Sequence, residues 1–142
     1  MKSGFFVSQT TRHILNTMND AVIVINDNRK AIFANKKFCE MTGYTENEIL
    51  GDSTRKFYDE ATAEKIQYID THERRQGIAS RYEGVMQSKS GKNITVLISG
   101  SPLPEGGSIA IITDITDVKN REALYRKLVE NMNEAVWTGD RH

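Results

Sequence analysis

The chain has 142 residues, a length that suits one packed domain. Its 19 basic and 19 acidic side chains cancel, and its apolar runs fall far short of the ~20 residues that span a bilayer, so neither a nucleic-acid partner nor membrane insertion is expected. A single cysteine, Cys39, excludes a disulfide framework, and we expect the chain in the cytoplasm or in the cytoplasmic portion of a membrane-bound receptor.

The beginning of the chain predicts a lead helix followed by a β-hairpin. Apolar residues recur at helical spacing over residues 8–19, which predicts a short amphipathic helix. The β-branched run at 21–26 and the stretch at 30–35 flank a turn-forming segment, so they predict two antiparallel strands.

Two short helices and one long helix are predicted next. Asn35 can cap a helix that ends at Gly43, since glycine readily adopts the left-handed conformation found at helix C-termini. The stretch from Thr45 to Glu48 is a capping box that opens a second helix. Residues 59–77 form the longest helical pattern, with apolar residues on one face and charges elsewhere.

Three strand-like runs complete the domain, at residues 80–88, 92–101 and 108–116, with glycine-containing turns between them. From residue 117 onward the pattern is helical again. This order indicates an α+β domain with a five-stranded antiparallel sheet, short helices on one face, and flanking N- and C-terminal helices.

A phrase near the beginning recurs 114 residues later. Residues 12–22 and 126–136 share five identical residues, and an acidic residue is kept at a sixth position. The period is too long for solenoid repeats of ~20–50 residues and fits whole domains in tandem, although a chance match is the alternative. We therefore expect a lead helix at 1–19, a domain at 20–117, and a linker helix with the beginning of a second domain at 118–142.

These phrases resemble a PAS domain over roughly residues 10–117. The resemblance rests on Asn-x-x-Phe at 35–38, on Thr-Gly-Tyr-x-x-x-Glu-Ile-Leu-Gly at 42–51, and on Asp-Ile-Thr at 114–116. It implies the PAS fold and a sensory or regulatory module of a multi-domain signal-transduction protein, most often a sensor histidine kinase. PAS domains often occur in tandem, which accounts for the repeat.

The resemblance also implies an interior pocket between the sheet and the helices, open to an unidentified small metabolite. Strand alternation and matching to pocket-bearing members of the family give its expected lining. That lining comprises Ile23, Ile25, Phe38, Met41, Ile66, Ile69, Val96, Ile98, Ala110 and Ile112. The alternative is an ordinary apolar core with no room for a ligand.

No cofactor is predicted. Flavin-binding members carry a reactive cysteine where this sequence has Thr54, and a glutamine where it has Ile112. Haem-binding members use a histidine early on the long helix, and the stretch 61–65 has none. Members that bind carboxylates use groups on the long helix and third strand, although such a charge run is usually solvated. The candidates of that kind are Arg74, Arg75, Arg81 and Tyr82.

Catalysis and metal binding find no support in the sequence. The three histidines are scattered, no cluster has the spacing of metal ligands, and no phosphate-binding loop is present. We expect a module without enzyme activity of its own, whose parent protein is a histidine kinase.

The two ends of the domain are expected to carry the output. Asp114 and Thr116 lie where the last strand gives way to a helix, and their oxygens can bond free backbone N–H groups and set the exit angle. We expect a homodimer through the flanking helices, with a second PAS domain and an output domain in the parent chain. The expected dimer and linker face comprises Ile14, Leu15, Met18, Val118, Tyr125, Leu128 and Met132. The rival interpretation is a dimerisation and spacing module without a ligand.

Overall fold

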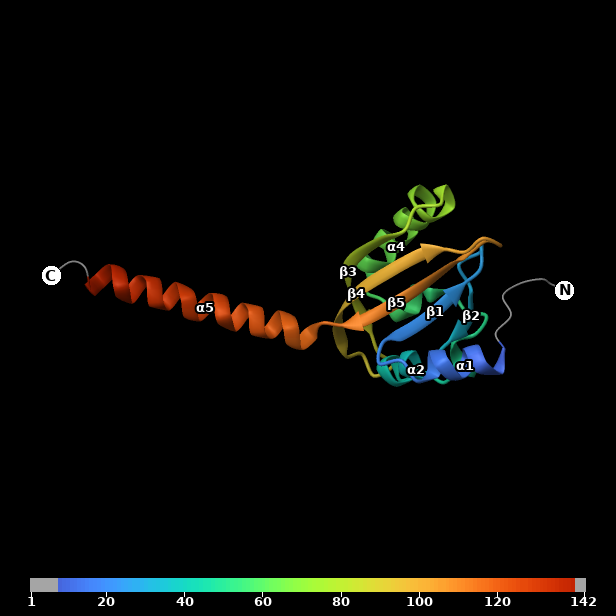
Figure 1. Ribbon diagram of the computed structural model, residues 1–142, viewed down its shortest axis with the longest axis horizontal. Coiled ribbons are helices and arrows are strands. Elements are labelled where there is room, and N and C mark those ends of the chain that lie inside the picture. Colours follow the sequence, from blue (N-terminus) through green and yellow to red (C-terminus); the bar gives the residue numbers. More distant parts are fainter. Residues whose placement is uncertain (1–7, 140–142) are drawn as a thin grey trace.

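A five-stranded antiparallel sheet lies at the centre of the fold, in the strand order β2-β1-β5-β4-β3 (Figure 1). The computed structural model describes residues 8–139, with side chains as far as residue 132. β-branched residues dominate the three central strands, as a pleated sheet favours. The strands are β1 (Ala21–Ile25), β2 (Ala31–Ala34), β3 (Ser80–Gln87), β4 (Asn93–Pro102) and β5 (Ser108–Asp114). The predicted α+β class with an antiparallel sheet is confirmed.

The first and last strands lie side by side at the centre of the sheet. β1 pairs with β2 along one edge and with β5 along the other, and both pairings are antiparallel. All five residues of β1 are buried, so both faces of this strand are covered. A strand covered on both faces has no reason to alternate polar and apolar residues, which explains its continuous apolar run.

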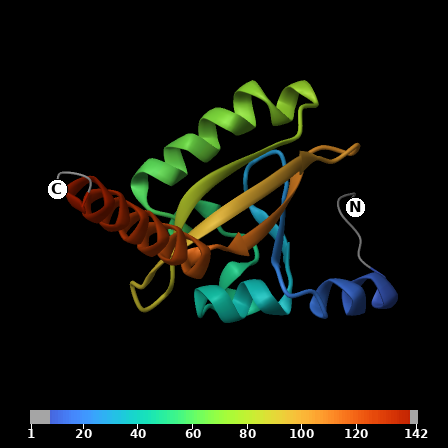
Figure 2. The same cartoon turned by 60° about the vertical axis from the view of Figure 1, so that its left-hand side comes forward.

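The helices that precede the long C-terminal helix cover the two faces of the sheet unequally (Figure 2). They are α1 (Gln9–Asn16), α2 (Lys36–Thr42), α3 (Glu46–Ile49), η1 (Thr54–Phe57), α4 (Glu60–His72) and η2 (Arg74–Gln76). Side chains of α2, α3, η1 and α4 join the main apolar core on one face of the sheet. Helix α1 packs on the opposite face through Leu15, and Met18, just after the helix, joins the same contact.

Side-chain caps fix where these helices begin. Asn35 Oδ1 accepts a hydrogen bond from Phe38 N at 3.0 Å, and the reciprocal capping box of Thr45 and Glu48 is formed. Asp59 caps α4 in the same manner. Because each cap satisfies an N–H group that the helix leaves free, the predicted beginnings at Asn35 and Thr45 are confirmed.

The carboxylate of Glu48 also ties α3 to the turn between β3 and β4. It accepts from Lys89 Nζ at 2.6 Å and from Thr45 N at 2.9 Å. The hydrogen bond from Lys89, followed by that from Thr45, lowers the pKa of Glu48 from 4.5 to about 2.

The lowered pKa of Glu48 predicts part of the acid sensitivity of the fold. A carboxylate whose folded pKa is depressed contributes stability that is present above the unfolded pKa and is lost as the pH falls toward the folded one. We therefore expect Glu48→Gln to flatten the loss of unfolding free energy between pH ~4.5 and ~2, measured by urea titration of both proteins. An equally steep loss in the variant would contradict this assignment.

Two segments depart from the sequence-based prediction. The turn η1 was not predicted, and it begins where Ser53 Oγ accepts from Arg55 N. The helical pattern at 59–77 breaks after His72, and Gly77, at φ +81°, then turns the chain toward β3. The break accompanies the burial of Arg74, whose side chain turns into the interior.

Helix α5 (Thr116–Gly139) extends away from the domain as a single helix of 24 residues (Figure 1). It includes Ala135 and Val136, where the repeat predicts the beginning of a strand. A strand needs a neighbouring strand to satisfy its backbone hydrogen bonds, whereas a helix satisfies them internally. All strands described in residues 8–139 belong to the one sheet of the domain. This segment is therefore helical, and the assignment of a second domain stays a prediction.

Candidate functional site

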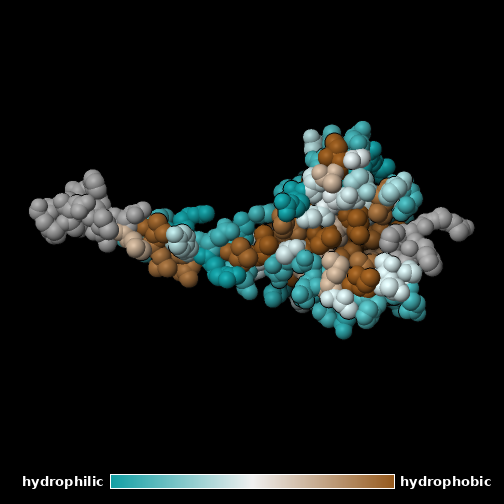
Figure 3. Space-filling view, in the orientation of Figure 1, coloured by the Kyte–Doolittle hydropathy of each residue, from teal (hydrophilic) through white to brown (hydrophobic). Residues whose placement is uncertain are grey.

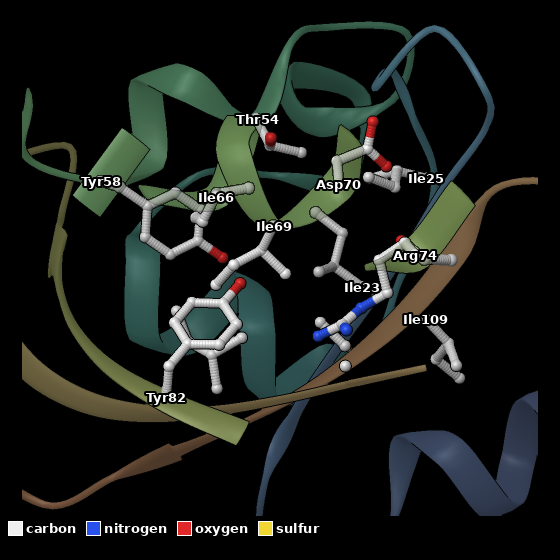
Figure 4. A pocket seen from close by; sticks show the side chains of 14 residues that line it. Ile23, Ile25, Thr54, Tyr58, Ile66, Ile69, Asp70, Arg74, Tyr82 and Ile109 are labelled. Atoms are coloured by element: carbon white, nitrogen blue, oxygen red, sulfur yellow. The ribbon is translucent and has the colours of Figure 1, made fainter. Parts of the chain in front are cut away.

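A cavity of about 40 Å³ lies between the sheet and α4 (Figure 4). Since one water needs ~10–15 Å³, this space suits a few waters or a ligand of a few non-hydrogen atoms. Its apolar wall consists of Ile23, Ile25, Ile66, Ile69, Ile98, Ile109 and Ala110. Its polar and small residues are Thr54, Tyr58, Asp70, Arg74, Tyr82, Gly100 and Ser108.

The predicted pocket residues divide into two groups. The cavity is lined by Ile23, Ile25, Ile66, Ile69, Ile98 and Ala110. Phe38, Val96 and Ile112 are fully buried in the same apolar core without lining the cavity, and Met41 packs against that core from a half-buried position. Their role in ligand binding stays a prediction.

Aromatic rings fill the interior beside α2 and so place the cavity on the α4 side. The rings of Phe38 and Phe57 meet edge to face at a centroid distance of 5.2 Å, and Tyr44 meets Phe57 at 5.4 Å. Such packing leaves no void between the rings. The interior is therefore a packed core at one end and a small cavity at the other.

Arg74 is the main difference between the expected and observed interior. The sequence left two interpretations open for Arg74, a ligand-binding group or part of a solvated charge run. The Arg74 side chain is only 5% exposed, whereas Arg75 and Arg81 are exposed. Arg74 Nη1 donates to Ile78 O at 2.9 Å and to Ser80 Oγ at 3.0 Å, and Nη2 donates to Ser80 O at 3.2 Å. These bonds offset the cost of burying the guanidinium.

Gly100 of β4 makes room for this guanidinium. A Cβ atom at Gly100 would lie 2.8 Å from Arg74 Nε, closer than real Cβ contacts allow. A glycine inside a strand often marks the close approach of another group, so Gly100 was a signal in the sequence that the interior holds a large side chain at this point.

Two phenols face the cavity, and one of them, Tyr58, was missed by the sequence reasoning. Burial raises the pKa of the Tyr58 hydroxyl, and it raises the pKa of Tyr82 to about 12. Both groups therefore keep their protons at neutral pH. Figure 4 shows the two hydroxyls pointing toward one another, and among the described residues neither hydroxyl has a hydrogen-bond partner.

Asp70, a further residue that sequence reasoning missed, links three segments at the edge of the cavity. Its Oδ2 accepts from Arg29 Nη1 at 3.1 Å and from Arg75 Nε at 3.0 Å. Arg75 also donates to the carbonyl of Asp27, whose carboxylate accepts from Gly107 N at 2.8 Å. The β1–β2 turn, the end of α4 and the β4–β5 turn are thereby joined beside the cavity.

The junction between β5 and α5 contains the hydrogen bonds expected of Asp114 and Thr116. Asp114 Oδ1 accepts from Thr116 N at 2.9 Å. Thr116 Oγ1 accepts from Thr95 N of β4 at 3.2 Å, and Thr95 O accepts from Ile115 N at 2.9 Å. The first turn of α5 is thus anchored on β4, while its role in signalling stays a prediction.

The predicted dimer and linker face is split between two environments. Leu15 and Met18 pack, half-buried, against the sheet of their own domain, whereas Ile14 is 56% exposed. On α5 the exposed apolar side chains are Val118, Leu124, Tyr125, Leu128 and Met132. Figure 3 shows apolar side chains along α5 and over the sheet surface.

Other kinds of site have little basis in the described residues. Between residues 8 and 139 no three His, Cys, Asp or Glu side chains gather as metal ligands. In the same stretch no helix combines the length and the apolar character needed to cross a membrane. Cys39 is half-buried, and this burial, with nearby acidic charges, raises the pKa of its thiol and so lowers its reactivity.

Comparisons with known proteins agree with this geometry. The family model described as "PAS domain" matches residues 19–117. The PAS domain of an HTR-like protein from Haloarcula marismortui is similar, with 22% identity, a TM-score of 0.65, and coverage of 75% of this chain and 89% of that chain. A domain of the sensory box sensor histidine kinase/response regulator from Geobacter sulfurreducens has 20% identity, a TM-score of 0.65, and coverages of 74% and 91%.

A third similar structure contains a small ligand. It is the PAS domain, in complex with ethanol, of a LuxR-family transcriptional regulator from Burkholderia thailandensis, with 15% identity, a TM-score of 0.63, and coverages of 78% and 99%. Identities this low show the fold alone, and no curated protein matches the chain. Because the family match spans well over half of the sequence, from the approach to β1 to the beginning of α5, the chain belongs to the PAS domain family of sensory domains.

Proposed function

We propose that this PAS domain is the sensory module of a larger signal-transduction protein, in which the contents of the cavity bias the position of α5. One observation carries the proposal. Ala110 of β5 lines the cavity, and four residues further along the same strand Asp114 fixes the beginning of α5. A single strand therefore connects the interior to the exit helix.

The neighbouring strands give this connection its mechanism. Ile23 of β1 is the cross-strand partner of Ala110, and Ile98 of β4 lines the cavity from the other side of β5. A ligand touching three adjacent strands can change their relative twist, and Thr95 of β4 transmits that change to Thr116. The ligand shifts the equilibrium only by the difference between its affinities for the two arrangements.

For the parent protein, we propose a sensor histidine kinase that works as a homodimer, with a second PAS domain and an output domain. Support comes from the Geobacter sulfurreducens neighbour and from the apolar side chains that α5 exposes at roughly heptad spacing. For the ligand, we propose a small metabolite. The neighbour bound to ethanol is consistent with a cavity of about 40 Å³.

The rival function is a dimerisation and spacing module with no ligand. Two observations favour it: the cavity is small, and apolar side chains of α5 such as Tyr125 and Met132 are 70% and 64% exposed. In that case a change in the interior would leave the exit helix undisturbed, which separates the two proposals.

Filling the cavity from the α4 side tests the coupling. We expect Ile66→Phe to shift the backbone amide resonances of Thr95, Thr116 and Val118, because the added ring mimics an occupant without altering the relay strands themselves. Glu64→Phe, on the exposed face of the same helix, is the matched control and should leave these amides unchanged. Two-dimensional ¹H–¹⁵N NMR of both variants gives the answer. If the amide resonances do not shift in a folded Ile66→Phe protein, the coupling is refuted and the spacing module is the function that fits.

A further inference from the structure

Two phenols reach the cavity from positions that a single strand, β3, holds in place. Tyr82 belongs to β3 and lies four residues before Met86, so both side chains point to the core face of the sheet. Tyr58, just before α4, forms an isolated bridge with Met86, and Asp59 N beside it donates to Val85 O at 3.0 Å. These backbone contacts fix the two rings relative to one another, and Figure 4 shows their hydroxyls pointing toward each other in the cavity.

The two hydroxyls are hydrogen-bond donors that the protein itself leaves unpaired. Neither has a partner among the described residues. Burial raises the pKa of both hydroxyls, and the neighbouring Tyr82 adds to the rise at Tyr58, so the two groups are close together and both keep their protons at neutral pH. A buried donor without an acceptor costs free energy. The pair therefore favours a cavity occupant with an oxygen that accepts from both hydroxyls.

The charged groups around the cavity have partners of their own, which favours an uncharged occupant. Arg74 donates three hydrogen bonds to the segment where β3 begins, and the rest of its guanidinium packs against the backbone of Gly100. Asp70 accepts from Arg29 and from Arg75. Burial of an ion without a counter-charge is costly, so a ligand with no net charge fits these surroundings best.

We propose that the cavity binds a small neutral carbonyl compound, an aldehyde or ketone of two or three carbons, whose oxygen accepts hydrogen bonds from the hydroxyls of Tyr58 and Tyr82. This inference deepens the sensory function proposed above and rests on it. A carbonyl oxygen has two lone pairs and can accept both bonds, whereas an alcohol adds an O–H group that needs a further acceptor. At ~10–15 Å³ for one water, a volume of about 40 Å³ limits the ligand to about three or four non-hydrogen atoms.

Isoleucine methyl NMR tests the ligand class. The whole chain, labelled with ¹³C at the isoleucine δ1 methyls, is titrated with acetone and with 2-propanol. We expect saturable shifts with acetone at the methyls that line the cavity, those of Ile23, Ile66, Ile69 and Ile98, while the exposed Ile14 stays fixed. Acetone should bind about three- to tenfold more tightly than 2-propanol, because the alcohol gives up one more hydrogen bond to water. The absence of saturable shifts with acetone, or equal or tighter binding of the alcohol, would overturn the proposal.

Two variants locate the carbonyl oxygen. Tyr58→Phe and Tyr82→Phe each keep the ring and remove a hydroxyl that has no partner among the described residues, so both proteins should fold. Each change should weaken acetone binding about three- to tenfold through the loss of one hydrogen bond. Tyr68→Phe, on a ring of α4 that is 60% exposed, is the matched control and should leave acetone binding unchanged.

A ligand without an acceptor separates hydrogen bonding from a change in cavity shape. Isobutene has the shape of acetone with a CH₂ group in place of the oxygen, so its affinity should not fall in Tyr58→Phe or in Tyr82→Phe. Unchanged acetone binding in either variant would show that its hydroxyl does not hold the ligand and would overturn the assignment. An equal loss of affinity for isobutene and acetone would overturn it as well.

The same titrations separate this inference from the function on which it rests. If acetone saturates the cavity but the backbone amides of Thr95 and Thr116 do not respond, the carbonyl site stands and the sensory coupling fails. If Ile66→Phe moves those amides while acetone produces no saturable shift, the coupling stands and the ligand class fails.

Discussion

Replacing Asn35 by alanine is expected to lower the free energy of unfolding by about 3–5 kcal/mol. The Asn35 side chain is fully buried and makes four hydrogen bonds. Its Oδ1 accepts from Val22 N at 2.9 Å and from Phe38 N at 3.0 Å, and its Nδ2 donates to Leu15 O at 2.7 Å and to Asp20 O at 3.1 Å.

The expected size of this loss follows from what the amide connects. An N-cap alone contributes about 1 kcal/mol, whereas each buried backbone group left without a partner costs about 1–3 kcal/mol. Thermal unfolding should show a melting temperature lower by about 10–20 °C. Asn120→Ala, on the exposed face of α5, is the control and should change stability by no more than ~0.5 kcal/mol. A loss of ~1 kcal/mol for Asn35→Ala would mean that the side chain acts only as a helix cap.

Replacing Phe57 by alanine is expected to cost about 3–5 kcal/mol, because it removes a fully buried ring from a packed cluster. The ring lies edge to face with both Phe38 and Tyr44, so its loss leaves a cavity that backbone movement fills only in part. Denaturation by urea measures the change in free energy. Tyr68→Ala, a ring on α4 that is 60% exposed, serves as the matched control and should cost far less. A loss for Phe57→Ala below ~1.5 kcal/mol would show that the α2 end of the interior can collapse.

Local chemistry made much of the fold predictable. Asn35, Gly43 and the capping box at 45–48 mark helix ends because they satisfy backbone groups within a few residues of themselves. The β-branched runs predicted the strands for a similar reason, because each strand pairs with a neighbouring strand that also contains β-branched residues. The turn η1 was missed because its short stretch, 54–57, is held by the burial of Phe57 in the assembled core and carries no periodic pattern.

The candidate site was less predictable, because it depends on contacts between distant segments. Alternation along the strands showed which residues share a face, and the resemblance to PAS domains placed the face with Ile23, Ile98 and Ala110 inside, where these residues line the cavity. It could not place Arg74, whose burial depends on the acceptors of Ser80 and on the missing side chain of Gly100. A charged residue enters a core only where tertiary partners compensate it, and no local pattern reports those partners.

The manner in which α5 leaves the domain has a mechanical consequence. Its contacts with the sheet come from its first turn, through Thr116 with Thr95 and through Lys119 Nζ with Glu83 Oε2 at 3.1 Å. At ~1.5 Å per residue the 24 residues of this helix reach about 36 Å, so a tilt of about 5° at the root sweeps the distal end through about 3 Å. Atomic adjustments around a ligand of a few atoms would thus be amplified, by leverage alone, into a displacement comparable to the width of a side chain.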